Sequence, residues 1–327
     1  MRLFQSDPDI RLIDSEIYLD PAESRKVGII SHGHSDHIGR HEHFIATAPT
    51  AAFLRARSGD DLNGTELAYG AKHRIDGWTV ELFPAGHVLG SAMVRVSNGT
   101  HALAYTGDFR LSPSYTAEPA EIPEADAVIM ESTYGGKPDW VFPSREELRE
   151  RLVTLAKQII ARDRTPVLLG YSLGKAQETA AMLRDSGVPL VMHPVVARIS
   201  AIYERNGIDL GTYEVWGRQS SLFGHRHTTD LRGKAVLIPP HMIREVRRVP
   251  RAETIALTGW ALHGTRDADH GLPLSDHADF NELVSFAEQC RAGVIYVTHG
   301  SRRFAEELRR RGIRAEFLSA KPQMRLF

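Results

Sequence analysis

Cysteine is almost absent from this chain: Cys290 is the only one among 327 residues. A single cysteine can form neither an internal disulfide nor a cysteine-based zinc cage, and it favours a reducing compartment, which predicts the cytoplasm. No stretch approaches the roughly 18 consecutive apolar residues of a membrane span. The first eight residues also lack the apolar segment of a secretory signal. We therefore expect no association with a membrane and no disulfide scaffold.

Net charge is also close to zero, because 40 Lys and Arg offset 41 Asp and Glu to give −1. This balance argues against a protein that binds nucleic acid through its overall charge, but it permits a local basic groove. The hydrophobic fraction of 42% and the charged fraction of 25% are typical of globular proteins and exclude a fibrous or disordered chain. Histidine is the one unusual count, at 16. Its distribution is therefore informative.

The length predicts about two domains, at roughly 150 residues per domain. Residues 1–137 read as short apolar strands separated by turns. Residues 138–253 alternate strands with helices, beginning with a helix that Ser144 and Glu147 mark with a capping box. Such alternation predicts a largely parallel sheet. From residue 254 the first pattern resumes, so we predict one α/β domain (1–137 and 254–327) interrupted by an inserted α/β domain (138–253).

The strongest motif is the sequence HGHSDH at residues 32–37, which directly follows an expected strand over residues 27–31. It places three histidines and one aspartate within six residues. Imidazole and carboxylate groups are ligands that zinc and similar metals accept readily. A mononuclear site needs only three protein ligands. Four in one loop therefore indicate two metals that share it.

Further candidate ligands follow three other expected strands, each beside a glycine. They are His87, Asp108 and His299, after strands 78–83, 102–106 and 294–298. Functional groups of α/β sheets gather at the carboxyl ends of the strands. Any one of these residues alone could be an ordinary loop residue. Together with HGHSDH they predict one metal centre.

The ordered motifs resemble those of metallo-β-lactamase-fold β-CASP nucleases. HGHSDH, AGHVLGS (85–91) and TGDF (106–109) are similar to the metal-binding motifs of that fold. ESTYG (131–135), PLSDHAD (273–279) and VTHG (297–300) are similar to the β-CASP motifs. The resemblance implies a metallo-β-lactamase αββα sandwich with an inserted α/β β-CASP domain, and a nuclease that hydrolyses phosphodiester bonds.

A narrower resemblance concerns the substrate. GYSLGKAQ (170–177), together with ESTYG and LSDHADF, is most similar to the bacterial ligase-associated DNA exonuclease group. Its members are often encoded beside an ATP-dependent DNA ligase and a helicase, which implies a functional partnership with both in DNA repair and action on single-stranded DNA ends. His299 is also typical of the RNA-processing branch, so a ribonuclease of the polyadenylation-factor type stays as the alternative. The inserted domain argues against a third possibility, a hydrolase of small molecules.

The resemblance also assigns roles to individual residues. It implies two divalent ions per chain, zinc or manganese, which activate a water for attack on the phosphodiester. One ion is assigned to His32, His34 and His87, the other to Asp36, His37 and His299, and Asp108 bridges both. The residues expected to act in catalysis are His277 as general acid, Glu131 as its partner, Asp36, and Asp20 as the residue that orients a ligand histidine.

Two basic features are candidate contacts for nucleic acid. Ser172 and Lys175 of the GYSLGK loop open an expected helix and are predicted to contact a substrate phosphate, although the loop also fits a helix start that only packs between domains. Arginines are dense in residues 244–251 and 302–311. These stretches could line a groove, or they could form solvated faces.

Overall fold

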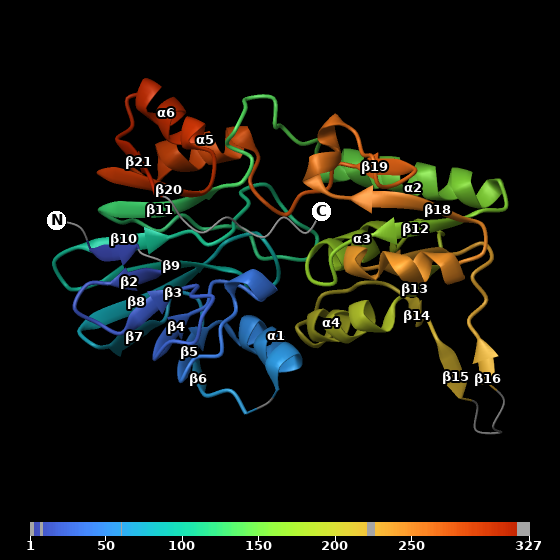
Figure 1. Cartoon of the computed structure of the whole chain (residues 1–327), viewed down its shortest axis with the longest axis horizontal. Coiled ribbons are helices and arrows are strands. Elements are labelled where there is room, and N and C mark those ends of the chain that lie inside the picture. The colour runs from blue at the N-terminus through green and yellow to red at the C-terminus, as the bar shows by residue number, and fades with distance from the viewer. Residues whose placement is uncertain (1–2, 7–8, 60, 221–225, 319–327) are drawn as a thin grey trace. The chain divides into compact units, whose positions relative to one another are not determined.

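The computed structural model describes residues 3–6, 9–59, 61–220 and 226–318 of the chain (Figure 1). The chain divides into two compact units. Unit 1 comprises Met1–Val141 and Asp276–Phe327, and unit 2 comprises Phe142–Ser275. Both are mixed α/β structures, as the sequence predicts.

Unit 1 contains two sheets. The first has the order β1-β2-β3-β4-β5-β6, with bounds Phe4–Ser6, Ile10–Leu12, Ile17–Leu19, Val27–Ile29, His43–Ala46 and Gly64–Glu66. The second has the order β21-β20-β11-β10-β9-β8-β7. In chain order its strands are β7 Lys72–Ile75, β8 Trp78–Pro84, β9 Ala92–Ser97, β10 Ala102–Tyr105, β11 Ala127–Ser132, β20 Val294–Gly300 and β21 Ala315–Phe317.

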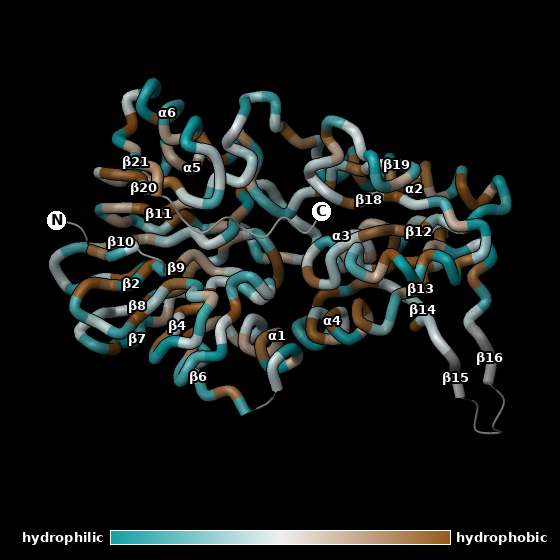
Figure 2. Tube along the Cα trace, viewed as in Figure 1, coloured by the Kyte–Doolittle hydropathy of each residue, from teal (hydrophilic) through white to brown (hydrophobic). Residues whose placement is uncertain are grey.

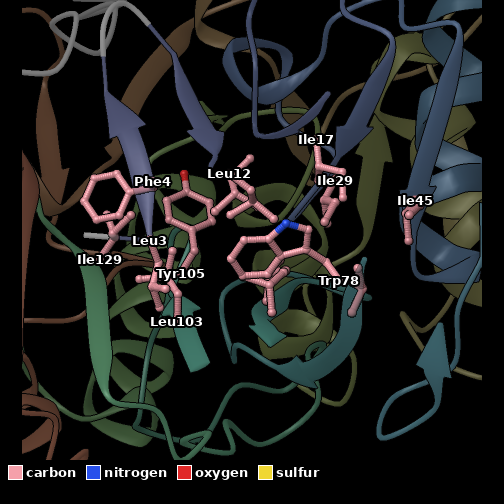
Figure 3. Close-up of a cluster of buried hydrophobic side chains, with 14 of the residues drawn as sticks. Leu3, Phe4, Leu12, Ile17, Ile29, Ile45, Trp78, Leu103, Tyr105 and Ile129 are labelled. Atoms are coloured by element: carbon pink, nitrogen blue, oxygen red, sulfur yellow. The ribbon is translucent and has the colours of Figure 1, made fainter. Parts of the chain in front are cut away.

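The main core of unit 1 is formed by side chains of both sheets. Leu12, Ile17 and Ile29 of the first sheet cluster with Trp78 and Leu103 of the second (Figure 3). Because successive side chains of a strand point to opposite faces, the strands β9, β10, β11 and β20 of the second sheet contribute to this core and to a second one on the other face. The sheets therefore pack face to face, as in a sandwich.

Helices cover the outer faces of this sandwich. Helices α5 (Phe280–Gln289) and α6 (Arg302–Arg310) contribute to a cluster on the other face of the second sheet. Helix α1 (Ala48–Ser58) shares a smaller cluster with β5. The layers are thus α, β, β, α, which confirms the predicted fold class.

Unit 2 has a parallel sheet with the order β14-β13-β17-β12-β18-β19, as its alternating pattern predicts. Its strands are β12 Thr165–Leu169, β13 Leu190–Met192, β14 Tyr213–Val215, β17 Ala235–Ile238, β18 Ala252–Leu257 and β19 His270–Leu272. A separate two-stranded antiparallel sheet is formed by β15 (Arg218–Ser220) and β16 (Arg226–Thr228). The helices are α2 (Arg145–Ala161), α3 (Lys175–Leu183) and α4 (Pro194–Arg205), and Figure 2 shows the hydrophobic residues along α4.

The chain returns to unit 1 at Asp276, later than residue 254, where the sequence pattern places the return. The reason is strand pairing. β18 pairs with β12 and with β19, so both late strands complete the sheet of unit 2. The start of unit 2 at Phe142 lies close to the predicted residue 138.

The strand directions explain how unit 1 gathers its polar residues. β10, β11 and β20 run parallel to one another, and β8 runs the same way because β9 is antiparallel to both β8 and β10. Their carboxyl ends therefore meet at one edge, where His87, Asp108, Glu131 and His299 lie. The HGHSDH loop follows β4, which belongs to the first sheet. Among the helices that the structure describes, none combines the length and apolar character needed to cross a membrane.

Candidate metal centre

Four side chains converge at the edge of the unit 1 sandwich: His32, His34, His87 and Asp108. Nδ1 of His34 lies 3.0 Å from Nε2 of His32 and 3.0 Å from Nε2 of His87. Oδ2 of Asp108 lies 3.5 Å and 3.8 Å from the same two nitrogens. Two ligands held 2.0–2.1 Å from a tetrahedral ion stand roughly 3.3 Å apart. The spacing therefore fits one divalent cation.

Hydrogen bonds at the rear of two rings fix which nitrogen faces the centre. The hydroxyl of Ser31 donates to Asp20 (2.5 Å), so it accepts from Nδ1 of His32 (2.9 Å). Nδ1 of His87 donates to the carbonyl of Asp276 (2.8 Å). The Nε2 atoms of His32 and His87 therefore carry no proton, and both can only accept a hydrogen bond from Nδ1 of His34. Nδ1 carries at most one proton, so it cannot donate to both. A cation among the three nitrogens resolves this conflict.

The charge state of the rings fits the same conclusion. Burial lowers the pKa values of His32, His87 and His299, because it disfavours the imidazolium form. Neutral imidazole is the form that binds metals. These rings are therefore ready to act as ligands near neutral pH.

Glycines allow the loops to approach one another. Gly86 precedes His87 with φ 75°, and a Cβ there would lie 2.1 Å from the carbonyl oxygen of Arg110. Gly107 precedes Asp108 with φ 54°, and a Cβ there would lie 2.6 Å from Cβ of Ser31. Any larger residue at either position would force these loops apart.

A second set of candidate ligands surrounds His37. Its Nε2 lies 3.5 Å from Oδ2 of Asp108 and 3.9 Å from Oδ2 of Asp36. Oδ2 of Asp108 is thus 3.5 Å from Nε2 of both His32 and His37, which is the position that a bridging ligand occupies. This set is looser than the first. Asp36 and His299 lie outside the groups whose ligand atoms all converge within 4.8 Å.

His299 reaches this region through an irregularity of β20. Glu131 and Ser132 of β11 pair with Thr298 and Gly300, so His299 is the extra residue of a bulge. Its φ of 49° is left-handed, a conformation that costs energy outside glycine. Its ring centroid lies 5.9 Å from that of His37, and among the described residues its buried Nδ1 has no hydrogen-bond partner. A metal ion would satisfy this nitrogen, whose burial is otherwise costly.

Asp20 holds His37 from behind. Oδ2 of Asp20 accepts from Nδ1 of His37 (2.9 Å), and its Oδ1 accepts from the backbone N–H of Ser31 (2.7 Å). Burial opposes a charge on His37, but the carboxylates of Asp108 and Asp20 outweigh it and hold its pKa well above the usual range. Such a concentration of negative charge is a suitable environment for a cation.

We expect Asp20→Asn to weaken metal binding by about 10- to 100-fold, because the loss of a carboxylate behind a ligand histidine typically has this effect. Titration of the metal-free protein with Mn²⁺ and Zn²⁺ measures the change. Asp14→Asn, at an exposed position in the same part of the chain, is the control. An unchanged dissociation constant in Asp20→Asn would show that Asp20 does not orient a ligand.

His277 and Glu131 form a pair beside the first ligand set. Nδ1 of His277 donates to Oε1 of Glu131 (3.0 Å), and Nε2 of His277 lies 3.8 Å from Oδ2 of Asp108. Burial opposes a charge on His277, but Glu131 and Asp108 overcome it and raise its pKa to about 9. Glu131 also accepts from the backbone N–H of Phe109 (3.1 Å) and the hydroxyl of Thr133 (2.6 Å). These hydrogen bonds hold the pair in place, and its imidazolium faces the candidate metal ligands.

Ser172 and Lys175, the predicted phosphate contacts, belong to unit 2. Lys175 begins helix α3 and is 6% exposed, with its Nζ 5.1 Å from the ring centroid of Tyr171. The side chain of Gln177 stabilises the loop by accepting from the N–H of Gly174 (2.9 Å) and donating to the carbonyl of Ser172 (3.0 Å). Within unit 2 these contacts define a firmly held helix start, and contact with a phosphate stays a prediction.

Sequence patterns assign no role to three groups of the centre: the side chains of Ser31 and Thr133 and the carbonyl of Asp276. Each makes a hydrogen bond to a predicted site residue. The available signal was their position, since each lies within two residues of a predicted ligand or catalytic residue. Polar neighbours of ligands commonly orient them.

Comparison with known proteins agrees with this geometry. Residues 270–317 match the family model of the Zn-dependent metallo-hydrolase RNA specificity domain. The chain is 36% identical over 318 residues to "Probable DNA ligase" of Opitutus terrae, and 30% identical over 239 residues to "Transcription termination factor FttA" of Thermococcus kodakarensis. These matches cover 94% and 60% of this chain, but only 30% and 36% of the relatives.

The fold has a counterpart among solved structures. A protein of unknown function from Enterococcus faecalis superposes with a TM-score of 0.63 at 16% identity, covering 91% of this chain and 80% of that one. This likeness concerns the fold alone. Together with the family match, the comparisons confirm the predicted resemblance to β-CASP proteins.

Proposed function

We propose that this metal-dependent hydrolase of the β-CASP type is a two-metal DNA exonuclease that acts on single-stranded ends in repair together with a DNA ligase. The observation that carries the proposal is the position of Asp108. Its Oδ2 lies between the two ligand sets and within 3.8 Å of Nε2 of His277. Candidate metal ligands and a candidate proton donor thus face one point, an arrangement that supports hydrolysis of a phosphodiester.

The described residues fit two divalent ions. His32, His34 and His87 would hold one, His37, Asp36 and His299 would hold the other, and Asp108 would contact both. Zinc and manganese both accept such a set of nitrogen and oxygen ligands. When bound, such ions supply Lewis acidity, which lowers the pKa of water and neutralises charge on phosphate oxygens.

Side chains of the protein would carry out the proton transfer. His277 holds a proton on Nε2, where it can pass to the oxygen that leaves phosphorus. Glu131 accepts from Nδ1 of the same ring and so fixes its orientation and tautomer. A cation held by Asp108 would lower the pKa of His277 from about 9 towards neutrality, because like charges repel. That shift would bring His277 nearer to the best range for a general acid at neutral pH.

The choice of DNA is supported by the relative named as a DNA ligase. A segment similar to 94% of this chain is part of that longer protein. Presence in one polypeptide supports a shared task, so we propose a functional partnership with an ATP-dependent DNA ligase and, by the sequence resemblance, with a helicase. The single cysteine agrees with action in the cytoplasm.

RNA processing is the second candidate. The matched family model is described as an RNA specificity domain, and residues 270–317 include both His277 and His299. A ribonuclease of the polyadenylation-factor type would use the same ligands and the same proton donor. The site chemistry does not distinguish the two polymers, because both contain phosphodiester bonds.

A cleavage assay separates the two candidates. We expect the protein to degrade end-labelled single-stranded DNA from one end in the presence of Mn²⁺ or Zn²⁺, and to cleave an RNA of matched sequence at least about tenfold more slowly. The chelator EDTA should abolish the activity, since metal ions supply the Lewis acid. Faster cleavage of the RNA would assign the protein to RNA processing instead. Labels at the 5′ and 3′ ends report the polarity and distinguish end-directed from internal cleavage.

A further inference from the structure

Trp260 is among the most exposed large apolar side chains of the described residues, at 44% exposure. It lies in unit 2, in the short 3₁₀ helix η3 (Gly259–His263) that follows β18. An indole is a large flat apolar surface that proteins ordinarily bury or place at interfaces. Neither the metal centre nor the hydrolysis mechanism uses it.

Hydrogen bonds and close packing fix the backbone of the turn that carries Trp260. The hydroxyl of Thr258 accepts from the N–H of Trp260 (3.4 Å), and the N–H of Thr258 donates to the carbonyl of Leu272 (3.2 Å). On the next residue, Ala261 packs so closely on Gly271 of β19 that a Cβ there would lie 2.9 Å from Cβ of Ala261. The backbone of the turn is therefore fixed to β19, so binding need not order it.

The neighbouring strands place further aromatic and basic residues at the same edge. β17, β12 and β18 are adjacent and parallel, with Leu169 of β12 paired with Ile238 and with Ala256. Their carboxyl ends thus lie side by side. The segment after β12 carries Tyr171 and Lys175, whose Nζ lies 5.1 Å from the tyrosine ring centroid.

Exposed arginines follow β17 at this edge. They lie in the 3₁₀ segment η2 (Pro240–Arg248). Arg248 pairs with Glu245 (2.6 Å), whereas exposed Arg244 and Arg247 have no carboxylate partner among the described residues. Unpaired guanidinium groups are available for phosphates. The carboxyl edge of the unit 2 sheet therefore combines an exposed aromatic side chain with unneutralised positive charge.

We propose that Trp260 stacks on a base of the single-stranded substrate while the basic residues of the same edge contact its phosphates. Aromatic surfaces flanked by cations are how proteins hold single strands without sequence preference, because every base has a flat face. This inference rests on the proposed function, and it adds a contact to the base. Stacking on one aromatic residue changes affinity by about 5- to 150-fold.

The test compares two substrates of the metal-loaded full chain. One is single-stranded DNA, and the other is a small phosphodiester, bis(p-nitrophenyl) phosphate, which has no base. We expect Trp260→Ala to lower kcat/KM for DNA by about 5- to 150-fold, mainly through KM, and to leave the small ester within about twofold. Trp260→Phe keeps an aromatic ring and should retain most of the activity on DNA. Tyr115→Ala, at an aromatic position of unit 1 with 40% exposure, should change neither substrate.

An oligonucleotide with abasic sites adds a second readout. With this substrate, kcat/KM of the unaltered protein should fall to the value that Trp260→Ala shows on ordinary DNA. The variant itself should cleave abasic and ordinary DNA with the same kcat/KM. Equal losses on DNA and on the small ester would overturn the inference, since they would indicate a structural effect. Unchanged DNA cleavage by Trp260→Ala would overturn it as well while leaving the proposed function intact. If the unaltered protein cleaved the small ester but no polynucleotide, the proposed function would itself fail.

Discussion

His34→Ala should reduce metal-dependent cleavage by at least about 10³-fold, because bound metal contributes several kcal/mol to such reactions and each 1.36 kcal/mol is a factor of ten. Nδ1 of His34 is the atom that faces Nε2 of both His32 and His87 at 3.0 Å. Its removal leaves two neutral imidazoles and one carboxylate in the tighter ligand set. We expect the metal content, measured by elemental analysis, to fall from about two ions per chain towards one.

The matched control is His101→Ala. His101 is a histidine of the same unit whose side chain is 45% exposed and which contacts only Asp126 among the described ion pairs, at 3.7 Å. Its removal should alter neither metal content nor rate. Full activity of His34→Ala at unchanged metal content would contradict the assigned ligand set. Circular dichroism of both variants checks that the fold is retained.

The convergence of the candidate ligand loops could be predicted from the sequence because their information is local. HGHSDH places four candidate ligands in one turn after a strand, and His87 and Asp108 each follow a strand beside a glycine. Parallel strands bring such positions to one edge without any knowledge of side-chain packing. The same locality explains why the parallel sheet of unit 2 could be predicted, whereas the layers of unit 1 were expected only from the resemblance to a family.

Contacts between distant residues could not be predicted from local patterns. His277 and Glu131 are 146 residues apart, and His87 is 189 residues from the carbonyl of Asp276 that fixes its ring. A hydrogen bond from the N–H of Ala278 to the carbonyl of Phe109 (2.6 Å) holds the segment that carries His277 and Asp276 beside the loop after β10. The sequence indicates these partners only through the resemblance to a family, and the carbonyl of Asp276 carries no side-chain signal at all.

Two features of the fold could not be predicted from the sequence, for related reasons. β18 alternates buried and half-buried residues like a strand of either unit, so only its pairing with β12 assigns it to unit 2. Helix α1 has a weak apolar stripe that is rich in alanine. Its available signals were Thr47, whose side chain accepts from the N–H of Thr50, and Pro49 in the first turn. Hydrophobic patterns decide which face of an element is buried, but not which neighbour covers it.

His277→Ala should slow cleavage of DNA by about 10²- to 10⁴-fold, the usual contribution of a general acid. The effect should depend on the leaving group. Bis(p-nitrophenyl) phosphate releases an anion that is stable at neutral pH and needs no proton, so the variant should lose less than about tenfold on this substrate. Because His277 is a proton donor in this proposal and lies outside the assigned ligands, the metal content should stay unchanged. Rates on both substrates and elemental analysis of the same preparation measure these expectations.

Glu131→Gln refines the test, because the amide keeps a hydrogen-bond acceptor while removing the charge. Glu131 is the largest of the contributions that raise the pKa of His277 to about 9. Its loss makes the imidazolium easier to deprotonate, so the alkaline limb of the rate profile on DNA should move to lower pH. The rate below that limb should fall less than in His277→Ala, since the proton donor remains. Equal losses on DNA and on the activated ester in His277→Ala would instead mean that the histidine positions the substrate, and proton transfer would then have to come from another group.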